Sequence, residues 1–252
     1  GNYTSDFLNV DTSFEVSAVA LTGSFNDPSG TPTFKLQKLG TGESFEGSLK
    51  AFWKFEDNTW QDSTTNNNDL TAVNTPVIVT GYIGNGVDLE STDYDYFYIN
   101  DANQVGLDLN GTSYTIAVWC KFEQITVSVH QMIFTKFGAA GQRGYILETG
   151  WNGELQYEHY YDGTNRDNVI SSSIFTPGVW YHCLARYNKD VGKLRIFING
   201  TPNGSEVSAS GDIINTTARV LVGRRDDVPD YGADGIIDEL AVWSRALTDS
   251  EI

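Results

Sequence analysis

Turn signals recur about every ten residues from Ser48 onward, and this spacing constrains the fold more than any other feature of the sequence. Short runs that alternate in polarity or are rich in aromatic residues lie between the turns. No stretch of ten or more residues shows strong helical periodicity. The pattern predicts an all-β protein. The expected strands are residues 49–55, 95–99, 114–122, 132–137, 144–149, 154–160, 179–187, 193–198, 219–223 and 235–243.

Two of these runs differ in how their faces are expected to be buried. The run 114–122, YTIAVWCKF, is largely apolar on both faces, which is typical of a central strand covered on both sides. Residues 154–160 alternate, and their polar positions are Glu154, Gln156 and Glu158. We expect that polar face to line an open surface.

Two Asn-Gly pairs separate neighbouring runs and predict tight hairpins. They are Asn152-Gly153 and Asn199-Gly200. A type I′ turn needs positive φ at both central residues, and Asn-Gly meets that need best.

The first 47 residues form a separate unit in this interpretation. FEVSAVALTG and TFKLQKLG read as strands, and a glycine-rich joint, GTGESFEGS, precedes Ser48. A segment this short rarely builds its own core. We therefore expect an N-terminal strand-rich arm over 1–47, either the end of a preceding domain or strands that dock on this or a neighbouring chain, and a β domain over 48–252.

Both ends of the chain suggest a fragment or a processed form. The chain opens on Gly1 without an initiator Met or a secretory signal. It stops after Thr248-Asp249-Ser250-Glu251, whose spacing is that of a helix-starting capping box.

The charge balance excludes some classes of partner. Lys and Arg total 16 against 33 Asp and Glu, giving a formal charge of −17, which repels phosphate backbones and anionic membranes. No apolar run approaches the roughly 20 residues of a membrane span. We expect neither nucleic-acid binding nor membrane insertion. Cys120 and Cys183 define no disulfide framework and favour buried free thiols.

Four stretches carry a resemblance to a known family. They are AFWKFEDN followed by DSTTNNNDLT, then GYIGNGVDLESTDYDYFYI, then YTIAVWCKF with GVWYHCLARYNKDVGKLRIFINGT downstream, and finally GADGIIDELAVWSRALTDSEI. In this order, over residues 48–252, they resemble the laminin G-like, concanavalin A-like jelly-roll module. The resemblance implies a two-sheet antiparallel sandwich of about six or seven strands per sheet, with one convex and one concave face.

The resemblance also implies a structural calcium ion. In proteins of this fold an Asp in a motif like "IDE" on the last strand holds Ca²⁺, and Asp238 matches it. We choose Asp62, in the loop after the first strand, as a second ligand. The alternative is that Asp238 accepts backbone hydrogen bonds or pairs with an Arg, and that Asp62 forms a turn.

Catalysis is not expected from the sequence. Hydrolases of this fold place carboxylates at alternate positions of one strand, whereas Glu154 and Glu158 would lie roughly 13 Å apart, too far for a glycosidase pair. The three histidines are scattered, and no nucleophile-elbow motif is present.

Ligand recognition is expected from loop residues instead, because sugars stack on aromatic faces and hydrogen-bond to a few polar groups. The candidates are Trp151, Tyr160, Tyr161, Arg224, Arg225, Asp226 and Tyr231. The loop charges could equally make only surface ion pairs.

The preferred function is therefore a non-catalytic carbohydrate-binding or adhesion module of an extracellular, cell-surface or virion-surface protein, with a glycan or cell-surface polysaccharide as partner. One alternative is a structural unit that decorates or bridges a virion or filament without a sugar ligand, using the arm 1–47 to bind a protein or a second copy. A second alternative is an appendage of a glycoside hydrolase or lyase.

Overall fold

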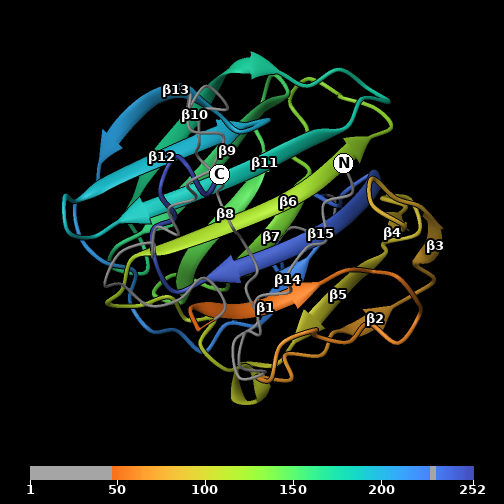
Figure 1. Cartoon of the computed structure of the whole chain (residues 1–252), viewed down its shortest axis with the longest axis horizontal. Coiled ribbons are helices and arrows are strands. Elements are labelled where there is room, and N and C mark those ends of the chain that lie inside the picture. The colour runs from red at the N-terminus through yellow and green to blue at the C-terminus, as the bar shows by residue number, and fades with distance from the viewer. Residues whose placement is uncertain (1–46, 228–230) are drawn as a thin grey trace, which may run out of the picture. The chain divides into compact units, whose positions relative to one another are not determined.

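Two antiparallel sheets packed face to face make up the described part of the chain, residues 47–227 and 231–252 of a computed structural model (Figure 1). The eight-stranded sheet has the order β13-β12-β11-β6-β15-β4-β3, with β1 paired to β15, and the seven-stranded sheet has the order β10-β9-β8-β7-β14-β5-β2. This confirms the predicted all-β jelly-roll sandwich. Of the predicted arm, only Gly47 lies within the described residues, so the arm stays a prediction.

The strands have the following bounds: β1 (Leu49–Trp53), β2 (Thr71–Val73), β3 (Val77–Thr80), β4 (Asn85–Leu89), β5 (Tyr96–Ile99), β6 (Tyr114–Phe122), β7 (Met132–Phe137), β8 (Arg143–Thr149), β9 (Glu154–Tyr160), β10 (Arg166–Ile174), β11 (Tyr181–Asn188), β12 (Lys193–Ile198), β13 (Thr201–Ser208), β14 (Val220–Val222) and β15 (Gly235–Trp243). A single 3₁₀ turn among the described residues, η1, spans Asp101–Asn103. No helix in this part of the chain has the length and hydrophobicity needed to cross a membrane.

Large aromatic side chains fill the space between the sheets, and their polar atoms have partners. Trp53 is buried and its indole donates to the Asn68 carbonyl over 2.8 Å. The Tyr114 hydroxyl lies 2.6 Å from Nδ1 of His159, a residue of β9 that faces the core. Burial lowers the pKa of His159, which favours the neutral form of its ring. These bonds offset the cost of removing polar groups from water.

Strand β6 is the central strand that its sequence predicts. It pairs with β11 on one side and β15 on the other. Its inner face lies in the core, and on its outer face Ala117 joins a second apolar cluster. Leu247 and Ile252, from the C-terminal segment, pack there, so the strand is covered on both faces.

The two cysteines are free and buried, on the paired strands β6 and β11. Their sulfur atoms lie 3.3 Å apart.

Both Asn-Gly pairs lie in the turn of a hairpin, and one of the two turn-type predictions is correct. Asn199 and Gly200 both adopt positive φ, 51° and 74°, between β12 and β13. The type I′ prediction at Asn152-Gly153 is wrong, because only Gly153 has positive φ. There the Gly150 amide donates to the Glu154 carbonyl over 2.7 Å, which closes a four-residue loop. That wider loop carries Trp151 outward, with 52% of its surface exposed.

A buried lysine joins η1 to the seven-stranded sheet. The side chain of Lys136, on β7, is 1% exposed, and its ammonium lies 2.5 Å from Asp101 Oδ1 and 3.2 Å from Asp108 Oδ1. It also donates to the Ala218 carbonyl over 2.7 Å. A buried charge needs such partners, since desolvation alone would cost several kcal/mol.

Candidate functional site

A hollow of about 300 Å³, the outer pocket, lies on the face of the seven-stranded sheet that points away from the core. Strands β8 and β9 supply Glu148, Gln156, Glu158 and Tyr160, while Leu155, Tyr157 and His159 of β9 face inward. The remaining lining residues are His130, Phe137, Arg143, Trp151, Arg166, Arg225, Asp227 and Tyr231. The period-two alternation of β9 therefore places one set of side chains in the core and the other in this pocket.

A glutamine bridges two carboxylates in the outer pocket. Gln156 Nε2 donates to Glu148 Oε1 and to Glu158 Oε1, each over 3.0 Å, so these two oxygens lie at most 6.0 Å apart. The other Glu148 oxygen lies 3.0 Å from His130 Nδ1. Burial raises the pKa of Glu148, and the hydrogen bond from His130 opposes that rise.

The second carboxylate of the pair, Glu158, is also fully engaged. Arg166 Nε lies 2.7 Å from its Oε1, and the Tyr160 hydroxyl donates to its Oε2 over 2.6 Å. Gln156 and Glu158 are each only 5% exposed. The expectation that the polar face of this strand lines an open surface is therefore wrong, because neighbouring side chains fold over it and form a pocket.

Aromatic rings form one wall of the outer pocket. Trp151 stands edge-on to His130 at 4.9 Å between ring centroids, and Tyr231 lies 5.2 Å from the same imidazole. The 52% exposed Trp151 ring is large and apolar, which makes it available for contact with a ligand.

Four of the seven predicted ligand-binding residues line this pocket, and three do not. Those in the pocket are Trp151, Tyr160, Arg225 and Tyr231. Tyr161, Arg224 and Asp226 lie outside its lining: the Arg224 guanidinium stacks 4.9 Å from the Tyr96 ring centroid, and Asp226 pairs with Arg219.

Sequence reasoning missed the residues that neighbouring strands bring to the pocket. Glu148 lies opposite Gln156 in the pairing of β8 with β9, and Arg166 lies opposite Tyr160 in the pairing of β9 with β10. The available signal was a carboxylate, Glu148, within the otherwise apolar run 144–149. Register between strands was not readable from that signal.

The two predicted calcium ligands have different surroundings. Asp62 accepts backbone hydrogen bonds from Phe52, Thr64 and Asn68, each over 2.9 Å, and another from the Thr64 hydroxyl over 2.7 Å. Both of its oxygens are therefore occupied in bracing the loop that follows β1. This arrangement matches the turn-forming alternative for Asp62.

Asp238 is the better fit to a cation. It is fully buried on β15, and its Oδ2 accepts the amides of Tyr82 and Ile83, each over 2.9 Å. Its Oδ1 is buried without a hydrogen-bond partner, and burial raises the pKa of the carboxyl. A cation at Oδ1 would satisfy that oxygen. Calcium at Asp238 stays a prediction.

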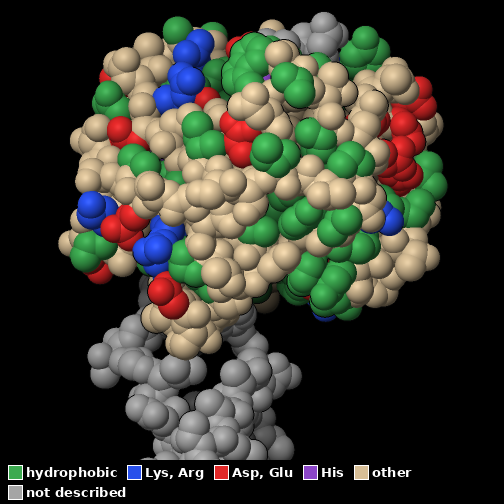
Figure 2. Space-filling model, turned by 90° about the horizontal axis from the view of Figure 1, so that it is seen from above, with side chains coloured by type: hydrophobic (Ala, Val, Ile, Leu, Met, Phe, Trp, Pro, Cys, Tyr) green, Lys and Arg blue, Asp and Glu red, His purple; other side chains and the backbone are tan. Residues whose placement is uncertain are grey.

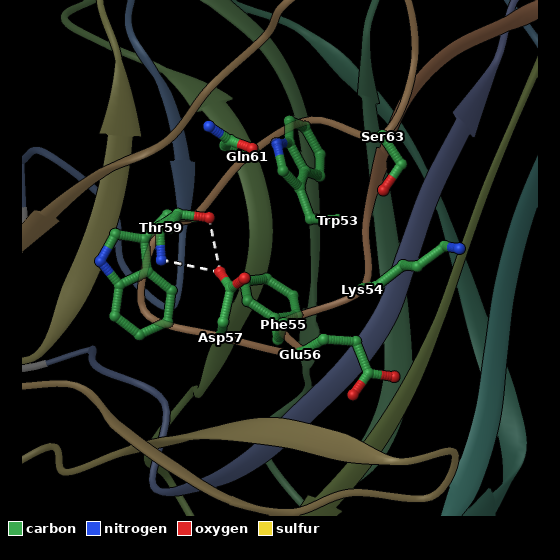
Figure 3. Close-up of a pocket in the computed structure, with 9 residues that line it drawn as sticks. Trp53, Lys54, Phe55, Glu56, Asp57, Thr59, Gln61 and Ser63 are labelled. Atoms are coloured by element: carbon green, nitrogen blue, oxygen red, sulfur yellow. Dashed lines mark hydrogen bonds between the residues drawn. The ribbon is translucent and has the colours of Figure 1, made fainter.

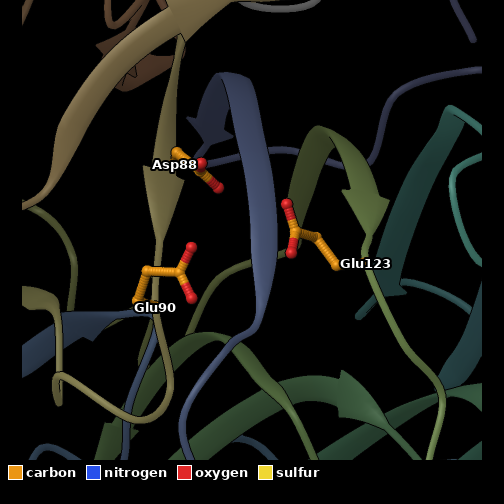
Figure 4. A group of neighbouring side chains, drawn as sticks. All are labelled: Asp88, Glu90 and Glu123. Atoms are coloured by element: carbon orange, nitrogen blue, oxygen red, sulfur yellow. The ribbon is translucent and has the colours of Figure 1, made fainter.

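A second acidic group could hold a divalent cation. Asp88, Glu90 and Glu123 turn their carboxylates toward one another, and one oxygen from each lies within 4.8 Å of the others (Figure 4). Burial first, and neighbouring carboxylates second, raise the pKa of Asp88 and Glu90. Figure 2 shows acidic side chains gathered on the right of that view, beside a hydrophobic patch. Such clusters also occur without an ion, so this geometry assigns no metal.

A smaller hollow of about 140 Å³ lies in the loop after β1 (Figure 3). Residues from 53 to 63 alone line it. Asp57 accepts hydrogen bonds from the backbone and the hydroxyl of Thr59, so its polar group is used within the loop. This hollow is smaller than the outer pocket and is built from one short segment of the chain.

Solved structures share this fold at low sequence identity. Domain 4 of AbnA, an extracellular arabinanase of family GH43 from Geobacillus stearothermophilus in complex with arabinotriose, aligns with a TM-score of 0.65 at 22% identity, covering 81% of this chain and 96% of that one. The binding domain of Paraclostridial Mosquitocidal Protein 1 aligns with a TM-score of 0.66 at 17% identity, covering 82% of this chain and 51% of that one. At these identities the likeness establishes the fold alone.

Sequence comparison gives one curated relative and a family. The human adhesion G-protein coupled receptor D1 is 33% identical over 92 residues, which is 34% of this chain and 10% of the receptor. The chain thus spans about a tenth of that relative. The family model Laminin_G_3, described as concanavalin A-like lectin/glucanases superfamily, matches residues 91–252, more than half of the chain. The chain therefore belongs to the Laminin_G_3 family of the concanavalin A-like lectin/glucanases superfamily.

Proposed function

We propose that this chain is a non-catalytic carbohydrate-binding module of an extracellular protein, and that the outer pocket holds the glycan. The observation that carries this proposal is the half-exposed Trp151 beside a pocket floor of bridged carboxylates, amide and guanidinium groups. The fold neighbours support it, since they include toxin binding domains and a domain of an extracellular arabinanase in complex with arabinotriose.

Each part of the outer pocket has a role in this proposal. The faces of Trp151 and Tyr231 stack on the C–H surface of a sugar ring. Gln156 and Glu158 hydrogen-bond to sugar hydroxyls, exchanging part of their mutual bonding for contacts with the ligand. Because strands β8 and β9 fix these groups, little side-chain entropy is lost on binding.

Hydrolysis is the second candidate function, because Glu148 Oε1 and Glu158 Oε1 lie at most 6.0 Å apart. Retaining glycosidases place their carboxyl groups about 5–5.5 Å apart. Binding is favoured over hydrolysis because neighbouring side chains hold both carboxylates, whereas an acid and a nucleophile must both reach the glycosidic bond. Release of reducing ends from a bound oligosaccharide, abolished by Glu158→Gln, would support hydrolysis instead.

The test is a glycan array followed by calorimetry with the best ligand. Trp151→Ala and Tyr231→Ala should each weaken binding about tenfold or more, because truncating a central aromatic anchor typically costs about 2 kcal/mol. Tyr82→Ala is the matched control, since Tyr82 is a similarly exposed aromatic residue, 49%, on a turn between β3 and β4 of the other sheet. Unchanged affinity in both pocket variants, or no ligand on the array, would contradict the proposal.

The bridging alternative depends on residues 1–47, which lie almost wholly outside the described residues. It stays a prediction, as does a virion-surface location. Comparing the molar mass in solution of the whole chain with that of a chain lacking residues 1–47 tests it, and association that requires the arm would favour it.

A further inference from the structure

Three arginines line the outer pocket, and two of them have counter-ions. Arg166 Nε lies 2.7 Å from Glu158, and Arg225 Nε lies 2.6 Å from Asp227. The Arg143 side chain has no hydrogen bond or ion pair with any residue in the described part of the chain, and its Nε is buried without a partner.

Stacking holds the unpaired Arg143 in place. The guanidinium carbon lies 4.9 Å from the ring centroid of Phe137 and 5.9 Å from that of Tyr160. Arg143 is the first residue of β8 and pairs directly with Phe137 of β7, so the strand register fixes this contact. A guanidinium stacked on aromatic rings keeps a fixed plane and leaves its N–H edge for a planar, bidentate acceptor.

The ion pairs of the outer pocket leave one guanidinium for an anionic acceptor. The Arg166–Glu158 and Arg225–Asp227 pairs neutralise themselves. The third carboxylate, Glu148, is 1% exposed and is held by Gln156 and His130. Arg143 therefore remains as a preorganised positive charge in a chain whose formal charge is −17. A neutral sugar gives this guanidinium only weak acceptors, whereas a carboxylate gives it a charge-assisted pair of hydrogen bonds.

We propose that the outer pocket selects glycans that carry a carboxylate, and that Arg143 binds this group. The proposal rests on the carbohydrate-binding function proposed above and narrows its ligand class to uronic or sialic acids. The carboxylate would lie against the Arg143 edge, while the sugar ring stacks on Trp151.

The experiment compares acidic sugars with neutral counterparts by calorimetry on the whole chain. One arm uses a trigalacturonide and the same trisaccharide with its carboxylates reduced to alcohols, and the other uses sialyllactose and lactose. We expect at least one acidic form to bind about tenfold or more tightly than its counterpart, the effect of a hydrogen bond to a charged group. Raised salt should reduce the difference.

Two variants of Arg143 and one control complete the design. Arg143→Gln should abolish the preference for the acidic form, and Arg143→Lys should keep part of the preference because it keeps the charge without the planar fork. Arg195→Gln, on β12 of the other sheet, should change neither affinity. Thermal unfolding of each variant checks that it folds.

The outcomes separate this inference from the proposed function. Equal affinity for acidic and neutral forms, or a preference that survives in Arg143→Gln, overturns the inference while the carbohydrate-binding function stands. Failure of every glycan to bind overturns both.

Discussion

Glu239 should make the stability of this protein fall as the pH rises through neutrality. It lies at a bulge in β15 with a left-handed φ of 51°, and its carboxylate lines a hollow with Trp119 and other aromatic residues. Burial first, then the charges of Asp238 and Glu56 against the opposing effect of Lys54, raise the pKa of Glu239 from 4.5 to about 7. The ionised form is thus disfavoured in the folded state.

The magnitude follows from that difference in pKa. Each pKa unit corresponds to about 1.36 kcal/mol, so a rise in pKa from 4.5 to about 7 would change the free energy of unfolding by about 3.4 kcal/mol if Glu239 were fully buried. Glu239 is only half-buried, so water screens its charge and we expect about 1–2 kcal/mol. The favourable contribution is complete below pH 4.5 and is lost as the pH rises through about 7. Glu239→Gln should therefore stabilise the protein by about 1–2 kcal/mol near pH 8 and change little near pH 5.

Urea denaturation followed by tryptophan fluorescence measures the free energy of unfolding of wild type and of Glu239→Gln, at about pH 5 and at about pH 8. Glu251→Gln is the opposite control. Two guanidinium hydrogen bonds from Arg245, of 2.6 and 2.7 Å, lower the pKa of Glu251 to about 2, so its loss should destabilise the protein at both values of pH. The reasoning would be refuted if Glu239→Gln were less stable than wild type near pH 8. It would also be refuted if the substitution changed the free energy of unfolding by the same amount at both values of pH.

Two further predictions follow from buried charges. Calcium at about 100 times its Kd should stabilise the fold by about 2.7 kcal/mol, a rise in Tm of about 5–11 °C that a chelator reverses and Asp238→Asn abolishes. A Tm insensitive to chelator, with no calcium found by metal analysis, would exclude the ion. Lys136→Met should cost about 3 kcal/mol in urea denaturation, because it leaves the Asp101 and Asp108 carboxylates without their shared cation. A loss below about 1 kcal/mol would show that water screens those two carboxylates effectively.

The sequence located most strands of the sandwich interior but not its edges. Runs such as 114–122 and 235–243 have the bounds of β6 and β15, because burial on two faces demands apolar residues there. The strands it missed are β2, β3, β4, β10 and β13, and four of these are the ends of the two sheets. An edge strand such as β13, TPNGSEVS, is mostly exposed, so few of its positions require an apolar residue.

The calcium and turn predictions show the same limit at the level of single residues. Asp238 stood out in the sequence as a carboxylate in an apolar strand, and it is buried as that position implies. Its hydrogen-bond donors are the amides of Tyr82 and Ile83, in a hairpin some 150 residues earlier in the chain. The sequence around Asp238 does not identify them. Likewise the loop at Asn152-Gly153 was set by the Gly150–Glu154 bond and not by its Asn-Gly pair alone.

The sequence by itself determined that the chain is all β, which face of β9 points outward, and that Trp151 and Tyr231 are loop aromatics. These features are local, because side chains alternate with a period of two and turn residues act where they stand. Only the tertiary structure decided that Glu148 lies across from Gln156, that Arg166 reaches Glu158, and that Arg143 stacks on Phe137 without a counter-ion. Those contacts depend on the register between strands. Backbone hydrogen bonds between separate segments fix that register, and the spacing of residues within one segment does not encode it.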